Sequence, residues 1–252
     1  MATGSEEGRA SKKAIALFAR AAVLLGIAGL AAILFTPPSA PSPGTGLPAY
    51  RSREAGPGVI LTFEITEGER VPLEVLEVLR RFSTPATFLV TGSWARGHPA
   101  LVQRMLREGH RVGSLGWRQT SLDRYPREVM REEISRAARL LSSLGVGSPL
   151  LFRPPNGTWN AALLEEAERL GQRVILWGLD SQDWSGLGPD YIADRVVRLA
   201  EPGQVIRFTA DDSSADTPLA LPAVLVGLKE RGIEVVGEPA WPGFPGGLPI
   251  SP

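Results

Sequence analysis

From residue 59 onward, short apolar runs alternate with longer segments in which apolar residues recur at helical spacing. Side chains repeat every second residue in a strand and about every 3.6 residues in a helix, so the short runs indicate strands and the longer segments helices. Gly109 and Gly171 follow two of the helical segments and mark their ends. The predicted strands are 59–63, 86–90, 110–115, 150–152, 174–180, 204–208 and 233–236. The predicted helices are 73–82, 98–108, 127–144, 159–170, 189–200 and 219–231.

The alternation of strands with helices predicts one α/β domain built from βαβ units around a parallel sheet. Seven or eight strands in one domain favour a barrel, whose functional residues lie beyond the carboxyl ends of the strands. Acidic, aromatic and polar side chains collect at those positions, which suits a carbohydrate-binding groove. For any single residue, loop solvation or capping is the alternative. The positions are Glu64, Thr91–Trp94, Gly116–Gln119, Arg153–Gly157, Asp180–Trp184 and Thr209–Asp212.

The N-terminal segment from Ala14 to Phe35 is apolar on every helical face and is interrupted only by Arg20. At about 1.5 Å per residue, this segment is long enough to cross a bilayer. Lysines and arginines cluster before or early in it and none follows until Arg51, so the positive-inside rule places the N-terminus in the cytoplasm. We therefore expect a single-pass protein of the cell membrane with an extracytoplasmic domain. A signal peptide cleaved after Ala40 is the alternative.

The sequence on either side of this apolar run divides into further predicted parts. Residues 36–58 are rich in Pro, Gly and Ser and lack apolar periodicity, which is typical of a semi-extended spacer. The predicted parts are a cytoplasmic N-terminus (1–13), a transmembrane signal anchor (14–35), a linker (36–58), the α/β domain (59–238) and a Pro/Gly-rich C-terminal tail (239–252).

Composition narrows the possible chemistry. Of the 252 residues, 27 are Lys or Arg and 27 are Asp or Glu, and this zero net charge does not suggest nucleic acid as a partner. There is no cysteine, which excludes disulfides, thiolate metal sites and cysteine nucleophiles. His98 and His110 are the only histidines, which excludes a histidine-rich zinc site.

Four stretches carry a family resemblance. They are PATFLVTGSWARGHPALVQRMLREGHRVGS, FRPPNGTWN, WGLDSQDW and PGQVIRF, in this order between residues 59 and 236. Together they resemble the polysaccharide deacetylase, or NodB-homology, family, and the resemblance implies an irregular seven-stranded (β/α) barrel. TFEITEGER, SWARGHP, RPPNG and DSSADTPLALP are similar to a membrane-anchored branch of that family in endospore formers. That branch maintains mature spores, so this closer resemblance implies a role in sporulation.

The resemblance implies a metal-dependent hydrolase that acts on cell-wall glycan. Family members with complete motifs hydrolyse N-acetyl groups from N-acetylglucosamine or N-acetylmuramic acid residues. An aspartate and two histidines hold a divalent metal such as zinc, which activates water and polarises the amide carbonyl. A neighbouring aspartate acts as the base and a late histidine as the acid. An arginine of the RPP motif orients the base, and a further aspartate supports the late histidine.

Several of these positions carry unsuitable residues in this chain. The base position is Glu64, which keeps the carboxylate but adds a methylene to the side chain. The other family positions correspond to Ile65 for the metal aspartate, Leu115 and Gln119 for the metal histidines, and Thr209 for the late histidine. A metal bound only through Gln119 and water has no strong protein ligand. We therefore expect no cofactor and severely impaired metal-dependent deacetylation.

The residues that surround the family's reaction centre are better retained. Arg153, Asp180 and Asp183 match the supporting positions of the family's catalytic site. The predicted substrate-binding residues are Asn156, Gly157, Trp184, Trp117 and Trp94. Both histidines match structural positions of the family, where capping or packing is expected in place of metal ligation.

The sequence leaves three functions open. The first is binding of cell-wall or spore-cortex glycan without hydrolysis, with Glu64 and Arg153 either anchoring sugar hydroxyls or forming a structural ion pair. The second is an active deacetylase or another hydrolase with altered chemistry that uses Glu64, Asp180 and Asp183 as acid and base. The third is a non-catalytic scaffold in a sporulation complex. The expected partners are the glycan and, through the anchor, the membrane, whereas protein partners are not predicted.

Overall fold

A computed structural model of the protein describes residues 58–147 and 150–237. These residues cover nearly all of the predicted α/β domain. The predicted anchor (14–35), the predicted linker up to residue 57 and the predicted tail (239–252) lie outside them. Within the part of the chain that the structure describes, no helix is long and apolar enough to cross a membrane.

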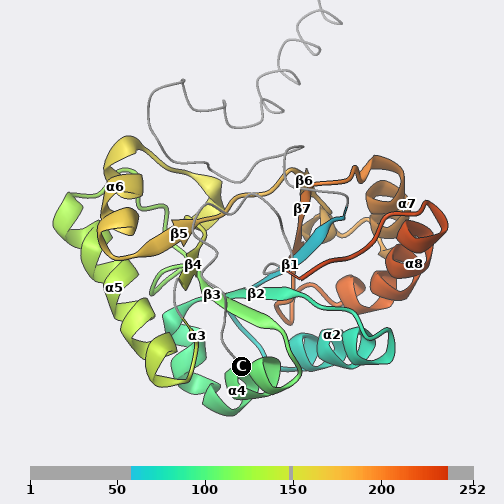
Figure 1. Ribbon diagram of the computed structural model, residues 1–252, viewed down its shortest axis with the longest axis horizontal. Helices are drawn as coiled ribbons and strands as arrows, with labels where there is room; N and C mark the ends of the chain where they lie inside the picture. Colours follow the sequence, from blue (N-terminus) through green and yellow to red (C-terminus); the bar gives the residue numbers. More distant parts are fainter. Residues whose placement is uncertain (1–57, 148–149, 238–252) are drawn as a thin grey trace, which may run out of the picture. The chain divides into compact units, whose positions relative to one another are not determined.

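Seven parallel strands form one curled sheet, which confirms the predicted α/β class (Figure 1). The strands are β1 (Ile60–Ile65), β2 (Thr87–Val90), β3 (Arg111–Ser114), β4 (Leu150–Phe152), β5 (Gln172–Val174), β6 (Leu179–Asp180) and β7 (Val205–Thr209). Their order across the sheet is β5-β4-β3-β2-β1-β7-β6. No pairing joins β5 to β6 in the described residues, so strand hydrogen bonds do not close the barrel.

Helices surround the strands (Figure 1). They are α2 (Arg70–Arg81), α3 (Gly92–Gly97), α4 (Pro99–Arg107), α5 (Arg127–Ser143), α6 (Ala161–Arg169), α7 (Pro189–Leu199) and α8 (Asp216–Glu230), with two 3-10 turns, η1 (Pro155–Gly157) and η2 (Asp183–Ser185). Each predicted helix is present within a few residues of its expected bounds. The short helix α3 is additional, and it begins where the hydroxyl of Thr91 accepts a hydrogen bond from the backbone N–H of Trp94.

Two predicted strands differ from the structure. The apolar run 174–180, expected as one strand, contributes Val174 to β5 at one edge of the sheet and forms β6 at the other edge. Residues 175–178, here called the seam, change partners, because the N–H of Ile175 donates to a carbonyl of β4 and that of Gly178 to a carbonyl of β7. The expected last strand, 233–236, contributes only an isolated bridge to the residue before β1. Apolar periodicity does not report which neighbour a strand pairs with, so neither difference is visible in the pattern.

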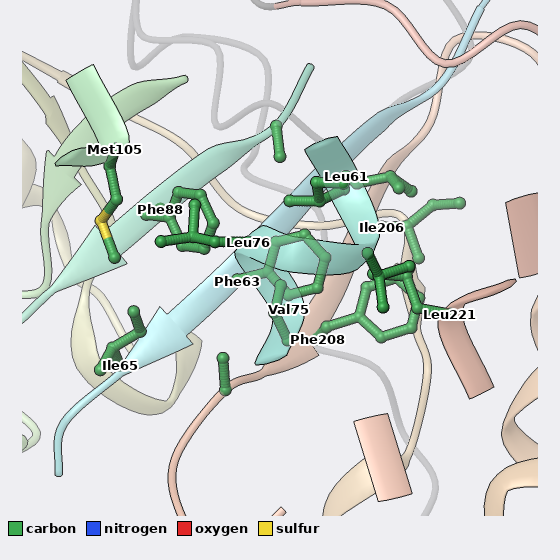
Figure 2. Packing of buried hydrophobic residues seen from close by; sticks show 14 of the residues in the cluster. Leu61, Phe63, Ile65, Val75, Leu76, Phe88, Met105, Ile206, Phe208 and Leu221 are labelled. Atoms are coloured by element: carbon green, nitrogen blue, oxygen red, sulfur yellow. The ribbon is translucent and has the colours of Figure 1, made fainter. Parts of the chain in front are cut away.

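Alternation along the strands separates an outer apolar layer from an inner lining. On β1, Leu61, Phe63 and Ile65 belong to the main hydrophobic cluster, together with Val75 and Leu76 of α2 (Figure 2). The ring of Phe63 stacks on one ring from each neighbouring strand, at centroid distances of 5.5 and 5.3 Å. A register shift of one residue would turn these side chains away from the helices, so their burial fixes the register. The intervening residues of β1 therefore face the interior of the barrel.

Candidate functional site

Glu64, the predicted base position, lies inside the barrel near the end of β1 and is bound by two arginines. Glu64 is only 3% exposed. Nη1 of Arg153 donates to Oε1 at 3.1 Å, and Nη2 of Arg207 donates to Oε2 at 3.0 Å. Nε of Arg207 also lies 3.0 Å from Oε1, as an ion pair without hydrogen-bond alignment. Guanidinium groups therefore engage both carboxylate oxygens.

Arg153 follows β4 and links the seam to β1. Its side chain is fully buried. Besides Glu64, its guanidinium donates to Thr62 Oγ1 at 3.0 Å and to the carbonyls of Ile175 and Leu176 at 3.3 and 3.1 Å. Buried carbonyls without a partner are destabilising, and these two lie where the sheet switches from one edge to the other. Arg153 therefore satisfies backbone acceptors of the seam in addition to balancing the charge of Glu64.

Arg207 belongs to this centre but was not among the predicted site residues. It lies on β7 between Val205 and Thr209, and its Nη1 donates to Asp180 Oδ2 at 2.9 Å. The guanidinium thus connects a carboxylate on β1 with one on β6, and its carbon lies 4.9 Å from the ring centroid of Trp177. Strand alternation is the signal that finds this residue. If Thr209 faces the site, the residue two positions earlier faces the same way.

The buried charges favour one another's ionised forms. Burial acts to raise the pKa of Glu64, but Arg207 and Arg153 outweigh burial and hold that pKa below its usual value. Burial lowers the pKa of Arg153 to about 10, with Glu64 acting in the opposite direction. Burial also acts to lower the pKa of Arg207, yet Glu64 and Asp180 raise it above its usual value. Glu64, Arg153 and Arg207 are therefore charged at neutral pH, and with the Asp180 carboxylate the centre carries two positive and two negative charges.

Asp183 forms a second buried acidic group, at the start of η2. Its Oδ2 accepts hydrogen bonds from the backbone N–H of Thr209 at 2.6 Å and from the hydroxyl of Thr217 at 2.7 Å. Burial raises the pKa of Asp183 to about 6, although these hydrogen bonds act in the opposite direction. Asp183 Oδ1 and Thr209 Oγ1 are buried without a hydrogen-bond partner in the described part of the chain. Asp183 therefore ties the end of β7 to α8 and, unlike Glu64, titrates near neutral pH.

The predicted aromatic residues differ in exposure. Trp184 is 61% exposed, so its ring is open to solvent beyond the end of β6. Trp94 is 4% exposed, its Nε1 donates to a backbone carbonyl at 2.7 Å, and its ring stacks on His98. Trp117 is 8% exposed, and the guanidinium carbon of Arg136 lies 3.8 Å from its ring centroid. Neighbouring groups cover the rings of Trp94 and Trp117, so of the three predicted tryptophans Trp184 offers the most open ring, and substrate binding stays a prediction for all three.

The two predicted substrate-binding residues of η1, Asn156 and Gly157, also differ in their surroundings. Asn156 is exposed, and its Nδ2 donates to Ser121 Oγ at 2.9 Å. Gly157 has a φ of +68°, and a Cβ on it would lie only 2.5 Å from the ring of Trp177. Glycine at this position therefore permits close packing against the tryptophan that contacts both guanidinium groups of the centre. Asn156 therefore lies at the surface, whereas Gly157 supports a neighbouring ring, and substrate binding by either residue stays a prediction.

The side chains at the family's metal positions do not fit a divalent ion. Ile65 lies in the outer apolar layer, on the opposite face of β1 from Glu64. Leu115 is fully buried in an inner apolar cluster with side chains of β1, β2, β4, β7 and the seam. Gln119 is exposed, and a single amide oxygen is a weak ligand. In the described residues there is no group of three or more His, Cys, Asp or Glu side chains that could hold a metal.

The two histidines make packing contacts. The Nδ1 atom of His98 lies 2.9 Å from the carbonyl oxygen of Trp94, and its ring stacks on that indole. His110 is buried with its ring edge-on to Phe88, and burial lowers its pKa. Neither ring nitrogen of His110 has a hydrogen-bond partner among the residues that the structure describes. These contacts agree with the structural role expected for both residues.

The centre is therefore a closed ion-pair network with a small accessible edge. A general base must accept a proton, but guanidinium groups already donate to both oxygens of Glu64 and favour its ionised form. The lowered pKa of Glu64 weakens it further as a base. The side chains of Asp180 and Arg207 are 25% and 16% exposed, so solvent reaches the network at these two groups. Ligand hydroxyls can form hydrogen bonds there.

Comparison with known proteins agrees with this architecture. The sequence matches the family profile described as polysaccharide deacetylase over residues 51–175. A chitooligosaccharide deacetylase from Bradyrhizobium sp. is 30% identical over 190 residues, which cover 70% of this chain and 87% of the relative. A peptidoglycan-N-acetylglucosamine deacetylase from Bacillus cereus is 29% identical over 181 residues, which cover 71% of this chain and 84% of the relative.

A solved structure shares the fold. BA3943, a CE4 family pseudoenzyme from Bacillus anthracis, matches with a TM-score of 0.68 and 24% sequence identity, covering 74% of this chain and 65% of the other. The fold and the sequence relatives thus agree. The chain belongs to the polysaccharide deacetylase family, which includes N-deacetylases of peptidoglycan and of chitooligosaccharides.

Proposed function

We propose that the protein binds N-acetyl-amino-sugar glycan of the cell wall or spore cortex without metal-dependent hydrolysis. The observation that carries this proposal is the pairing of both Glu64 oxygens with two guanidinium groups. A carboxylate held in this way is a poor ligand for a divalent ion and a poor acceptor for a proton from water. Glycan is the ligand class that the relatives support, since they include deacetylases of peptidoglycan and chitooligosaccharide.

The groups exposed near the centre suit a sugar chain. The open ring of Trp184 offers an apolar face for a pyranose ring, and Asp180 offers acceptors for its hydroxyls. Asn156 adds an amide at the surface of η1. Such a site binds through stacking on Trp184 and hydrogen bonds from sugar hydroxyls to Asp180, and the network that holds Asp180 has no net charge.

A metal-free hydrolase has less support from the geometry. It would need two carboxyl groups free to act as acid and base on the glycan. Both oxygens of Asp180 accept hydrogen bonds, from the N–H of Gln182 at 2.8 Å and from Arg207 at 2.9 Å. Since both oxygens of Glu64 are also engaged, and Asp183 is buried, none of the three predicted carboxylates is poised at the surface for proton transfer.

The absence of catalysis is tested by acetate release from N-acetylglucosamine oligomers and cortex peptidoglycan. The purified full-length protein is assayed with added zinc, with cobalt and with a chelator, beside Glu64→Gln. Glu74→Gln, on the exposed face of α2, is the matched control. We expect no release above background from any of the three proteins. Turnover that both the chelator and Glu64→Gln abolish would overturn the proposal, because it would require a metal held by other side chains.

Glycan binding is tested by titration calorimetry of the same full-length protein with chitooligosaccharides. Trp184→Ala should weaken binding about 3- to 10-fold through loss of the stacking surface. Leu187→Ala is the matched control, since Leu187 is 59% exposed and follows η2. Binding that neither variant changes would place the ligand elsewhere. No binding by the unaltered protein would favour the scaffold function.

We also propose that the domain acts outside the cytoplasm, held by the anchor at 14–35, and that it serves sporulation. The support is the apolar run with its preceding lysines and arginines and the resemblance to the spore-maintenance branch. Alkaline phosphatase fused after residue 252 should be active in cells only if the domain is exported. Immunoblotting then separates an uncleaved anchor from a chain shortened by cleavage after Ala40.

A further inference from the structure

Arg207 occupies an unusual position for a buried cation, because two carboxylates from different strands converge on it. Its Nη2 lies 3.0 Å from Glu64 Oε2 on β1, and its Nη1 lies 2.9 Å from Asp180 Oδ2 on β6. Bridging acidic oxygens from separate elements is what a hard divalent ion does in a carboxylate site. The same task is performed here by a side chain of the protein.

We propose that Arg207 is the resident cation of this centre and that its guanidinium excludes a divalent ion from Glu64 and Asp180. The proposal goes beyond glycan binding, because it concerns which positive charge the two carboxylates hold. The missing ligands at Ile65 and Leu115 explain why a metal would be bound weakly. Arg207 explains why the acidic groups that remain do not attract one.

Charge balance supports this assignment. Glu64 and Asp180 contribute two negative charges, and Arg153 and Arg207 contribute two positive charges. Without Arg207, the same centre would carry one unbalanced negative charge, and Glu64 Oε2 and Asp180 Oδ2 would each lose a hydrogen-bond donor. With Arg207 in place, an added divalent ion would have to lie beside two guanidinium groups, and like charges repel strongly where water is excluded.

The partial exposure of Arg207 and its packing against Trp177 allow the assignment to be tested by substituting this residue. The side chain of Arg207 is 16% exposed and that of Asp180 is 25% exposed, so an ion from solvent can reach the position. Methionine at position 207 removes the charge while keeping an unbranched, apolar side chain that can pack against Trp177. Arg207→Lys keeps a positive charge at the same place and is the matched control.

The experiment measures thermal unfolding of the full-length protein, stripped with a chelator, as MnCl2 is added. Manganese is the probe because an all-oxygen site prefers a hard ion. The Tm of Arg207→Met should rise by about 3–6 °C when manganese reaches about ten times its Kd. The Tm of the unaltered protein, of Arg207→Lys and of the surface variant Arg198→Met should stay within about 1 °C. Adding Glu64→Gln to Arg207→Met should remove the response.

Loss of the free manganese signal in electron paramagnetic resonance counts the bound ions directly and does not depend on Tm. If Arg207→Met does not fold, Arg207→Gln provides the neutral substitution with a remaining donor. The proposal is overturned if the unaltered protein binds manganese as tightly as the neutral variant. It is also overturned if the folded neutral variant binds none, or if Arg207→Lys binds equally well. None of these readouts involves glycan, so their failure is distinct from failure of the proposed function.

Discussion

The inner lining of the barrel has two parts with opposite chemistry. The apolar lining consists of Ile60, Leu89, Leu115, Leu151, Ile175 and Val205, all fully buried. The charged lining consists of Glu64, Arg153, Asp180 and Arg207, joined by ion pairs. The two parts meet between adjacent strands, since Glu64 of β1 is in register with Leu89 of β2.

The difference shows how the barrel balances buried charged groups with its own side chains. The charged lining contains its own counter-ions, and the apolar lining supplies packing but no ligand atom. A buried ion pair depends on both partners, because removing one leaves an unbalanced buried charge. An apolar side chain instead contributes through the area and volume that it fills. Substitutions in the two linings should therefore destabilise the protein for different reasons.

The largest effect is expected in the charged lining. Arg153→Met should lower the free energy of unfolding by about 3–5 kcal/mol, because it strips Glu64 of one guanidinium and leaves two seam carbonyls without donors. Urea unfolding at pH 7 measures the loss. Arg104→Met, which breaks a half-buried pair on α4, should cost at most about 1 kcal/mol. Adding Glu64→Gln to Arg153→Met should recover part of the loss, and a cost below about 1 kcal/mol for Arg153→Met would contradict the picture.

In the apolar lining, Leu115→Ala should cost about 2–5 kcal/mol through lost burial and the cavity that remains. Leu115→Met nearly conserves volume and should cost less than about 1.5 kcal/mol. Urea unfolding at pH 5 and pH 7.5 should give the same loss at both values, because no charge changes. A loss that depends on pH would show that this position is coupled to the charged lining.

Asp183 differs from Glu64 in how it responds to pH, because among the described residues no guanidinium forms an ion pair with its buried carboxyl group. Its pKa is about 6 in the folded protein against an ordinary value of 3.8, so the folded state binds the proton more tightly. The contribution of this group to stability therefore falls as pH rises from about 4 to about 6, by up to about 3 kcal/mol. Glu64 has the opposite sign: its lowered pKa contributes stability above its ordinary value of 4.5, which is lost on further acidification.

The variant Asp183→Asn isolates the Asp183 contribution. Its amide oxygen can still accept hydrogen bonds from Thr209 and Thr217, and the variant cannot ionise. The difference in unfolding free energy between Asp183→Asn and the unaltered protein should therefore grow in favour of the variant between pH 4 and pH 7. If the difference stays constant across that range, Asp183 is not the titrating group.

The smallest effect is expected at the tryptophans. Trp184→Ala should change the unfolding free energy by less than about 0.5 kcal/mol, because the side chain is largely exposed. Trp94→Phe should cost about 1 kcal/mol, because it removes the hydrogen bond from Nε1 to Gly68 O in a buried setting. Thermal unfolding of both variants checks the ranking, and the reverse order would contradict the assignment of Trp94 to packing and Trp184 to the surface.

Local patterns in the sequence were sufficient to predict the parallel α/β fold and the approximate bounds of six helices, but not α3. Alternating periods of apolar residues report which face of each element is buried, and that information is local. The same reasoning placed Glu64 and Arg153 at strand ends that meet in a barrel, and the structure joins them in an ion pair. The family resemblance added the correspondence of Ile65 and Leu115 to metal positions.

Only the tertiary structure decided the rest, because it depends on partners that are distant in sequence. The run 174–180 divides between two sheet edges since its ends pair with β4 and β7. Strand alternation along β7 places Arg207 on the same face as Thr209, but its contacts with Glu64 and Asp180 depend on how distant strands pair. Trp117 is covered because Arg136 of α5 lies over its ring, whereas Trp184 is largely exposed in the described part of the chain. Residue type predicts what a side chain can do, and its neighbours in space determine whether it is free to do so.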